Sequence, residues 1–458
     1  MNNLKLYNTL GKKLENFNPI NSENIRIYAC GPTVYDSIHI GNARPLVVFD
    51  ILVRLLKTIY PKVTYVRNIT DVDDKINQRA NEKKISITEL TNQTIKDFHI
   101  HCLSLCNLTP EYEPKATDHI NEMIEMIKTL ISKGFAYVSS NNVLFSIKKF
   151  NKYGNLSGRL LEEMISGSRV NVAEYKNNPG DFILWKPSSK ELPGWNSPWG
   201  RGRPGWHIEC SAMSKKYLGN HFDIHAGGAD LIFPHHENEI AQSCCANNSS
   251  LMANYWIHNG YVTSEGEKMS KSLGNFTTIK NLLANYDGES IRYALLQAHY
   301  RAPLSFSVNT VSEAKKSLSR LYRAVDGFEV NGEVDKEIFL NLNDDLNTPK
   351  ALARSHYLAD QANKGSKECA QQLKNSSLIL GILSNSSENW LKYGSANQQD
   401  NVNLNSTMND NQINNLILER KMAKDNKDFS KADEIRETLL KSNITLEDKA
   451  DKTVWRRS

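Results

Sequence analysis

Apolar and polar residues near the start of the chain follow a pattern that predicts a β-strand, a helix and a second strand. Residues 25–29 have the two-residue period of a strand. From Pro45 the apolar positions form the broad stripe of an amphipathic helix, and residues 63–69 predict the second strand. Such a βαβ unit has a right-handed crossover and favours a phosphate group at the N-terminus of its helix. His39 and Gly41 stand at that point, so we expect a nucleotide pocket there.

The pattern changes before it returns to alternating strands and helices. Residues 86–134 predict helices, and residues 135–200 predict short strands followed by a stretch rich in Gly, Pro, Ser and Trp, which is typical of an insertion with a mobile loop. The α/β pattern resumes with a helix over residues 206–217 and a short strand over residues 221–224. A glycine-bearing turn then leads to a helix that we expect to start at Pro234.

The remainder of the chain is mostly polar and helical, which predicts a bundle of about four helices. An Asn-, Gln- and Ser-rich linker and a last helical module with a basic tail follow. The fold class is therefore α/β, with an interrupted α/β domain followed by helical parts. The expected boundaries are 1–115 and 205–259 for the two halves of the α/β domain, 116–204 for the insertion, 260–310 for a loop region, 311–400 for the bundle and 401–458 for the C-terminal module.

Composition excludes some classes of protein and leaves others open. The 458 residues carry a formal net charge of +5, which is compatible with a nucleic-acid partner without being evidence for one. The chain contains no run of ~20 apolar residues, so we expect no membrane span. We also expect no secretory signal. The seven cysteines are odd in number, irregularly spaced and without a CxxC motif, which favours a reducing compartment over a disulfide framework.

Four residues of metal-ligating type can be assembled from distant parts of the chain: Cys30, Cys210, His235 and Glu239. His235 and Glu239 are four residues apart, so they share one face of the predicted helix. Two thiolates, an imidazole and a carboxylate suit Zn²⁺. The spacing of these residues is not that of a zinc finger. An alternative interpretation is therefore that Cys30 and Cys210 are core residues and that His235 and Glu239 form a solvent-exposed pair. His207 and His236 are rival ligands, although His236 is turned ~100° from His235 on a helix.

Two other groups of possible metal ligands give weaker evidence for a metal site. Cys102 and Cys106 share a helix face, and we interpret them as partly buried structural residues. The acidic residues over 71–74 suggest a calcium loop at first, but the glycine and the distal glutamate of an EF-hand are missing. We expect a polar loop over an active site instead.

Five motifs in this order resemble the cysteinyl-tRNA synthetases, which are class I aminoacyl-tRNA synthetases. The motifs are CGPTVY from Cys30, HIGN from His39, GWHIEC ending at Cys210, PHHENE ending at Glu239 and KMSKS from Lys268. The resemblance extends over the chain to the closing VWRR at residues 454–457. It implies a class I Rossmann-type catalytic domain with an inserted segment, followed by a tRNA-binding helical bundle and a C-terminal module that binds the anticodon.

The family pattern implies roles for individual residues. The zinc ligands fall on Cys30, Cys210, His235 and Glu239. The catalytic residues are His39, Lys268 and Lys271; the nucleotide-binding residues are Thr33, His39, Gly41, Asn42, Lys268 and Lys271; and the walls of the amino-acid pocket are Thr70 and Trp206. Asn42 departs from the HIGH signature, because an amide cannot carry the charge of an imidazolium. Thr70 has a second interpretation as a helix cap before Asp71.

The activity implied is the ATP-dependent ligation of L-cysteine to tRNA(Cys) through a cysteinyl-adenylate, with transfer to the 2′-hydroxyl of the terminal ribose. Mg²⁺ accompanies ATP. One zinc ion per chain selects the substrate thiolate, with Glu239 as the weak ligand that gives way. A serine hydroxyl is a poor substitute, whereas an apolar pocket discriminates by only ~1–3 kcal/mol for a change of this size. We expect a cytoplasmic monomer with no membrane partner.

Two alternative functions stay open. A cysteine ligase of the mycothiol type shares the catalytic core and couples cysteine to an amino sugar, with no need to read an anticodon. The basic tail argues against it, because basic residues meet phosphates and Trp455 can stack on an unpaired base. A non-enzymatic zinc or RNA binder is the other class, and the intact KMSKS motif argues against that.

Overall fold

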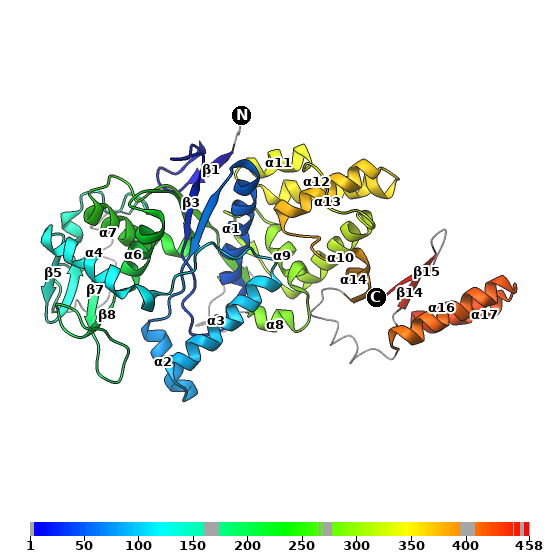
Figure 1. Cartoon of the computed structure of the whole chain (residues 1–458), viewed down its shortest axis with the longest axis horizontal. Coiled ribbons are helices and arrows are strands. Elements are labelled where there is room, and N and C mark those ends of the chain that lie inside the picture. The colour runs from blue at the N-terminus through cyan, green and yellow to red at the C-terminus, as the bar shows by residue number, and fades with distance from the viewer. Residues whose placement is uncertain are drawn as a thin grey trace. The chain divides into compact units, whose positions relative to one another are not determined.

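A computed structural model describes residues 4–159, 174–264, 267–268, 277–393, 408–442, 444–448 and 453–457 (Figure 1). The chain divides into two compact units. The first comprises residues 1–281, 295–307 and 337–351, and the second comprises residues 282–294, 308–336 and 352–458. Within the described part of the chain, no helix has the length and apolar character that crossing a membrane requires.

The first unit is built on a four-stranded parallel sheet in the order β10-β9-β3-β4. The strands are β3 (Ile25–Ala29), β4 (Val63–Arg67), β9 (Phe222–Gly228) and β10 (Ala253–Asn259). Ile27 lies opposite Tyr65 on one side and Ile224 on the other. The strand order therefore reverses between β3 and β9. In open parallel sheets, ligands bind at the carboxyl ends of the strands at such a reversal.

Helix α1 (Ile40–Ile59) joins β3 to β4 and starts five residues before the expected Pro45. His39 is its N-cap and forms a capping box with Asn42: the His39 side chain accepts from the Asn42 backbone, and the Asn42 side chain accepts from the His39 backbone. Gly41 fits because a Cβ there would lie 2.9 Å from the His39 ring. The apolar stripe begins late, so periodicity alone misplaced the start.

The segment expected to be helical over residues 86–134 is interrupted. It contains α3 (Ile87–Ser104), η1 (Ala116–His119) and α4 (Ile120–Ser132), preceded by α2 (Asp74–Lys83). Between α3 and η1 the chain runs beside β4, where Arg67 donates to the Tyr112 carbonyl at 3.1 Å. Pro110 and Pro114 explain the break, because proline removes a helix hydrogen bond and clashes with the preceding turn.

The insertion forms an antiparallel sheet of its own in the order β5-β6-β7-β8. Its elements are β5 (Ala136–Ser139), β6 (Asn142–Phe145), η2 (Ile147–Lys149), β7 (Phe182–Pro187) and β8 (Gly202–Pro204). The two short strands expected near its start are confirmed. The stretch expected to be only a loop also supplies β7 and β8.

The return to the main sheet differs from expectation around the glycine-bearing turn. After α6 (Trp206–Leu218), strand β9 extends to Gly228 and includes most of that turn. The next elements are η3 (Ala229–Leu231), η4 (Ile232–His236) and α7 (Glu237–Asn247). Helix α7 itself begins at Glu237, and the non-helical residue before it is Phe233, which has extended backbone angles (φ −139°, ψ 131°). His236 already has helical angles (φ −67°, ψ −34°), so the helical turn begins after Phe233, consistent with the expected start at Pro234.

The other elements of the chain are short strands and helices. The strands are β1 (Lys5–Asn8), β2 (Lys13–Asn16), β11 (Val262–Ser264), β12 (Glu267–Lys268) and β13 (Leu304–Ser305). The helices are α8 (Ile279–Leu283), α9 (Gly288–Leu296), α10 (Val308–Ala324), α11 (Lys336–Asn343), α12 (Thr348–Asn363), α13 (Lys367–Leu380) and α14 (Ser387–Tyr393).

The C-terminal module has a small core of its own. It consists of α16 (Asp410–Asp425), α17 (Phe429–Lys441) and the antiparallel pair β14 (Ile444–Asp448) and β15 (Thr453–Arg457), so the expected basic tail is a β-hairpin. Trp455 is 5% exposed in that core, and its indole N–H donates to Asn414. The ring is therefore not an exposed surface on which an RNA base can stack.

Candidate metal centre and active site

The four residues of metal-ligating type singled out in the sequence meet at one point in the first unit. Their candidate donor atoms all lie within 4.8 Å of one another. The sulfur atoms of Cys30 and Cys210 are 3.7 Å apart, and Cys30 Sγ is 3.5 Å from Glu239 Oε1. His235 Nε2 is 3.0 Å from the same Glu239 oxygen.

These separations fit a tetrahedral zinc ion. Zn–S bonds of ~2.3 Å and Zn–N and Zn–O bonds of ~2.1 Å at tetrahedral angles place two sulfurs ~3.8 Å apart, a sulfur and an oxygen ~3.6 Å apart, and a nitrogen and an oxygen ~3.4 Å apart. The first two values agree with those of Cys30, Cys210 and Glu239 within about 0.1 Å. The third pair is closer because the His235 ring and the Glu239 carboxylate form a hydrogen bond.

The four donors are positioned by β3, α6, η4 and α7. Cys30 follows the last residue of β3 at the carboxyl edge of the sheet and is partly exposed. Cys210 lies in the second turn of α6 and is 1% exposed. His235 precedes α7 and Glu239 lies in its first turn, both almost fully buried. The cluster therefore stands where the strand order of the sheet reverses.

Three further histidines, two of them unremarked in the sequence, surround the cluster. His225, on β9, lies with its Nε2 2.9 Å from Glu239 Oε2, so the two carboxylate oxygens have different partners. His236 Nε2 is 3.3 Å from Cys30 Sγ, and its Nδ1 is 2.8 Å from His258. A second possible ligand set, formed by Cys30, His225, His236 and Glu239, shares two members with the first. The first set suits zinc better because it supplies two sulfur donors.

His207, the other rival ligand, contacts the cluster from outside. Its Nδ1 lies 2.9 Å from His235 Nδ1, on the opposite side of the ring from the nitrogen that faces Glu239. Such a contact fixes the orientation and tautomer of a ligand histidine. Burial and the nearby His235 lower the pKa of His207 to about 3, so its ring is neutral.

Burial and neighbouring charges shift the pKa values of the four candidate donors in different directions. Burial alone would raise the pKa of Glu239, but His225 and His235 lower it to about 2. Burial opposes the charged form of His235, but Glu239 and Cys210 raise its pKa to about 10. Burial would also raise the pKa of Cys210, but hydrogen bonds from Cys30 and His235 lower it to about 6. Burial and the neighbouring Cys210 raise the pKa of Cys30.

The residues assigned to the nucleotide lie around the start of α1. Thr33 forms an isolated parallel bridge with Thr70, supported by a 3.1 Å hydrogen bond from the Val34 N–H to the Thr70 carbonyl. His39 is partly buried and bridges to Thr278, just beyond the KMSKS motif. Of the two motif lysines, Lys268 is placed by its backbone in β12, whereas Lys271 lies outside the described residues.

Thr70 and Trp206, the expected pocket walls, have different surroundings. Thr70 is 1% exposed and donates to Glu209 Oε2 at 3.0 Å, and its hydroxyl accepts from Asn68. It caps no helix, because Asp73 is the N-cap of α2. The Trp206 indole stacks on the His235 ring with centroids 4.2 Å apart, and the residue is 40% exposed.

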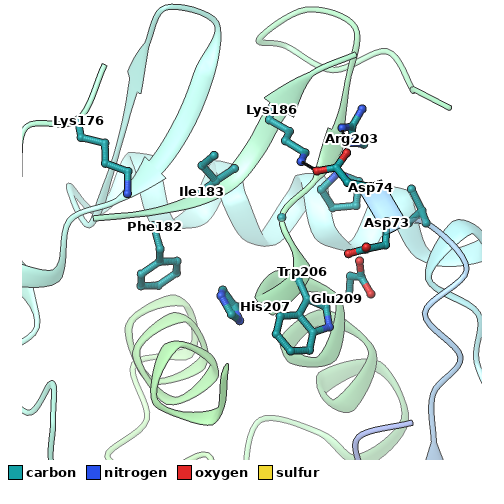
Figure 2. Close-up of a pocket in the computed structure, with 13 residues that line it drawn as sticks. Asp73, Asp74, Lys176, Phe182, Ile183, Lys186, Arg203, Trp206, His207 and Glu209 are labelled. Carbon is teal, nitrogen blue, oxygen red and sulfur yellow. Dashed lines mark hydrogen bonds and ion pairs between the residues drawn. The ribbon is translucent and has the colours of Figure 1, made fainter. Parts of the chain in front are cut away.

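A cavity of about 260 Å³ opens beside the cluster (Figure 2). Trp206, His207 and Glu209 line one part of it, and Asp74, Lys186 and Arg203 line another. Asp74 forms ion pairs with both cations. Partial burial would raise the pKa of Asp74, but the hydrogen bonds and charges of Lys186 and Arg203 lower it. Burial raises the pKa of the Glu209 carboxyl group well above its usual value.

Comparisons with known proteins show which proteins this chain is similar to. Residues 16–316 match the family model of the class I tRNA synthetase (C) catalytic domain. A cysteine–tRNA ligase of Rhodospirillum rubrum is 49% identical over 99% of this chain and 100% of its own length, and one of Pelagibacter ubique is 50% identical over 98% of both. Mycobacterium tuberculosis methionyl-tRNA synthetase, in complex with methionyl-adenylate, shares the fold at 15% identity, with a TM-score of 0.55 over 84% of this chain and 96% of that one.

Proposed function

Because this chain belongs to the cysteinyl-tRNA synthetases, a family of class I aminoacyl-tRNA synthetases that ligate cysteine to tRNA(Cys), we propose that its reaction runs through a cysteinyl-adenylate. In the first step an oxygen of the cysteine carboxylate attacks the α-phosphorus of ATP. The new P–O bond forms as the bond to the β-phosphate bridge breaks, and pyrophosphate leaves with Mg²⁺. In the second step a 2′-hydroxyl of the terminal tRNA ribose attacks the carbonyl carbon, and AMP leaves.

His39 binds the phosphates in this proposal. Its Nδ1 accepts the Asn42 backbone N–H, so the ring is neutral and its proton is on Nε2, from which it donates to a phosphate oxygen. The N-terminus of α1 adds a favourable dipole for negative charge. Lys268 and Lys271 neutralise the charge that develops on the departing pyrophosphate, and Thr33 and Gly41 complete the phosphate site.

Asn42 has a structural reason to replace the histidine of the HIGH signature. Its side-chain oxygen accepts the His39 backbone N–H at 3.3 Å, which completes the capping box. We therefore assign Asn42 to the orientation of His39 rather than to charge neutralisation.

Selection of cysteine is assigned to zinc held by Cys30, Cys210, His235 and Glu239. When bound, the ion supplies a Lewis acid that prefers a substrate thiolate to a hydroxyl. Glu239 remains the ligand that we expect to give way, because its Oε2 already accepts a hydrogen bond from His225 and can retain it when Oε1 is released. Trp206 forms a wall of the amino-acid pocket. Thr70 contributes through its hydrogen bond to Glu209.

The remaining parts of the proposal follow from the substrate. The helical bundle and the C-terminal module bind the body of the tRNA, and Lys421, Lys424 and Lys427 supply positive charge in the latter. A tRNA-charging enzyme works where translation occurs, so we assign the protein to the cytoplasm. We expect a monomer, which light scattering of the full chain tests.

The observation that carries this proposal is the convergence of Cys30, Cys210, His235 and Glu239 at zinc spacing. Cysteine-dependent pyrophosphate exchange without tRNA tests the adenylate step, and charging of a tRNA(Cys) transcript with labelled cysteine tests the whole reaction. We expect both activities, with a strong preference for cysteine over serine. Exchange without tRNA charging would instead favour the amino-sugar ligase of the mycothiol type, and neither activity would leave the non-enzymatic binder.

A further inference from the structure

Arg203, which lines the cavity beside the candidate metal ligands, carries a buried donor that no described residue uses. Arg203 is 8% exposed; its NH1 group donates to Ser188 Oγ at 3.2 Å, and its NH2 group pairs with Asp74. Among the described residues, its Nε has no hydrogen-bond partner. A buried guanidinium N–H without an acceptor is costly, so the residues around Arg203 do not fully satisfy this cation.

Arg203 acts together with Lys186. The two residues are register partners on the neighbouring strands β8 and β7, so their side chains leave the insertion sheet on the same face. Both reach the carboxylate of Asp74, the first residue of α2, and Figure 2 shows the three side chains gathered at one end of the cavity. The strands hold the two cations in place independently of Asp74.

Asp74 is the replaceable partner in this group. Its side chain is 60% exposed, whereas that of Arg203 is 9% exposed. Ion pairs with an exposed member contribute little and exchange partners readily. A phosphate group offers more acceptor oxygens than a carboxylate. It can therefore accept hydrogen bonds from an arginine guanidinium and from a lysine ammonium at the same time. The end of the cavity thus suits a phosphodiester.

The other end of the cavity suits a base and lies next to the proposed thiol site. The Trp206 indole stacks against His235 with centroids 4.2 Å apart, and the residue is 40% exposed and lines the cavity. A group in the cavity is therefore one indole ring away from a candidate zinc ligand. At about 260 Å³ the cavity is near the lower end of ligand sites, roughly 300–1,000 Å³, and so holds part of a large substrate.

We propose that this cavity receives the single-stranded 3′ end of the tRNA, with a backbone phosphate that replaces Asp74 on Arg203 and Lys186 and a base that lies against Trp206. Phosphates on cations and bases on aromatic rings are the usual way in which unpaired nucleotides are held. The proposal rests on the function proposed above and assigns Arg203 to binding of the second substrate. Asp74 is then a competitor that occupies the site when no tRNA is bound.

Two reactions measured in parallel test this assignment. Pyrophosphate exchange without tRNA reports the adenylate step and the integrity of the catalytic domain. Single-turnover transfer of cysteine from preformed adenylate to a tRNA(Cys) transcript is measured at subsaturating and saturating tRNA. Its rate reports how well the enzyme binds and aminoacylates the 3′ end of the tRNA. The variants are Arg203→Ala, Asp74→Asn and, as a matched control, Lys190→Ala, which removes an exposed cation of the same insertion outside the cavity.

Arg203→Ala should slow transfer at subsaturating tRNA by about tenfold, since it removes a charged hydrogen-bond donor, and leave exchange unchanged. Asp74→Asn should speed transfer at subsaturating tRNA, because it removes the competing charge, and Lys190→Ala should change neither reaction. Equal slowing by Arg203→Ala and Asp74→Asn would overturn the proposal and leave only an ion pair that braces the insertion. A parallel loss of exchange in Arg203→Ala would also overturn it, in favour of cysteine or ATP in the cavity. Failure of the proposed function is distinguishable, because it would appear in the unaltered protein as a lack of cysteine-dependent exchange.

Discussion

Removal of one sulfur from the metal cluster tests the zinc assignment most directly. Cys210→Ala deletes a donor that lies 3.7 Å from Cys30 Sγ, whereas Cys244→Ala deletes a sulfur on α7 that belongs to neither candidate ligand set. Both cysteines are buried in the same apolar cluster, at 1% and 6% exposure. The loss of packing is therefore similar, about 1 kcal/mol for one buried heavy atom, and only the effect on metal binding differs.

The size of that difference follows from the number of ligands. Structural zinc sites bind with roughly 10–16 kcal/mol, so one of four ligands accounts for about 3 kcal/mol, or about a hundredfold in the dissociation constant. Metal analysis after dialysis against a graded zinc chelator measures this loss. Pyrophosphate exchange with cysteine and with serine gives the accompanying selectivity. We expect Cys244→Ala to retain zinc and selectivity. Equal zinc content in the two variants, with selectivity intact in both, would refute the assignment.

Three further predictions concern other parts of the chain. Lys271→Ala should slow cysteine-dependent pyrophosphate exchange by about a hundredfold or more with little change in tRNA binding, and an unaltered exchange rate would contradict its role. Gly31→Ala should destabilise the catalytic unit by about 1–3 kcal/mol in denaturant titrations, because the added Cβ would lie 1.6 Å from the Asn68 carbonyl oxygen. Hydrogen bonds from Arg420 and other neighbours lower the pKa of Asp448, so its carboxylate stabilises the C-terminal module above pH ~4 and does so less as the pH falls. Asp448→Asn should therefore cost about 1 kcal/mol at neutral pH by hydrogen exchange, with a difference that shrinks in acid; a difference that grew in acid would refute the sign.

The sequence predicted the parts of the site whose signals are local. The strand before Cys30 has a clear two-residue period, and His235 and Glu239 share a helix face by spacing alone. The residue types suggested that four distant donors form one metal site, and the family motifs implied the same set, whereas periodicity alone cannot relate distant residues. The start of α1 was missed because its first turn is polar, and its capping box depends on a contact between His39 and Asn42 that only the fold reveals.

The surroundings of the site required the three-dimensional structure. His225 lies in a segment expected to be a turn, and its approach to Glu239 depends on the extension of β9 to Gly228. The role of Arg203 was likewise hidden, because its strand is three residues long and lies within a stretch rich in glycine and proline. Trp455 was expected to be an exposed base-stacking residue because it sits among charges, but the hairpin turns its ring into a core.

The pairing of β3 with β9 has a consequence for folding of the chain while it is synthesised on the ribosome. β3 and β4 emerge early, but the partner for the other edge of β3 is translated about 200 residues later, which at ~5–20 residues per second is a delay of about 10–40 s. During that interval β3 exposes unsatisfied N–H and C=O groups along an apolar edge, which invites association with other chains. Nascent chains halted before β9 should therefore depend on chaperones far more than chains halted after β10.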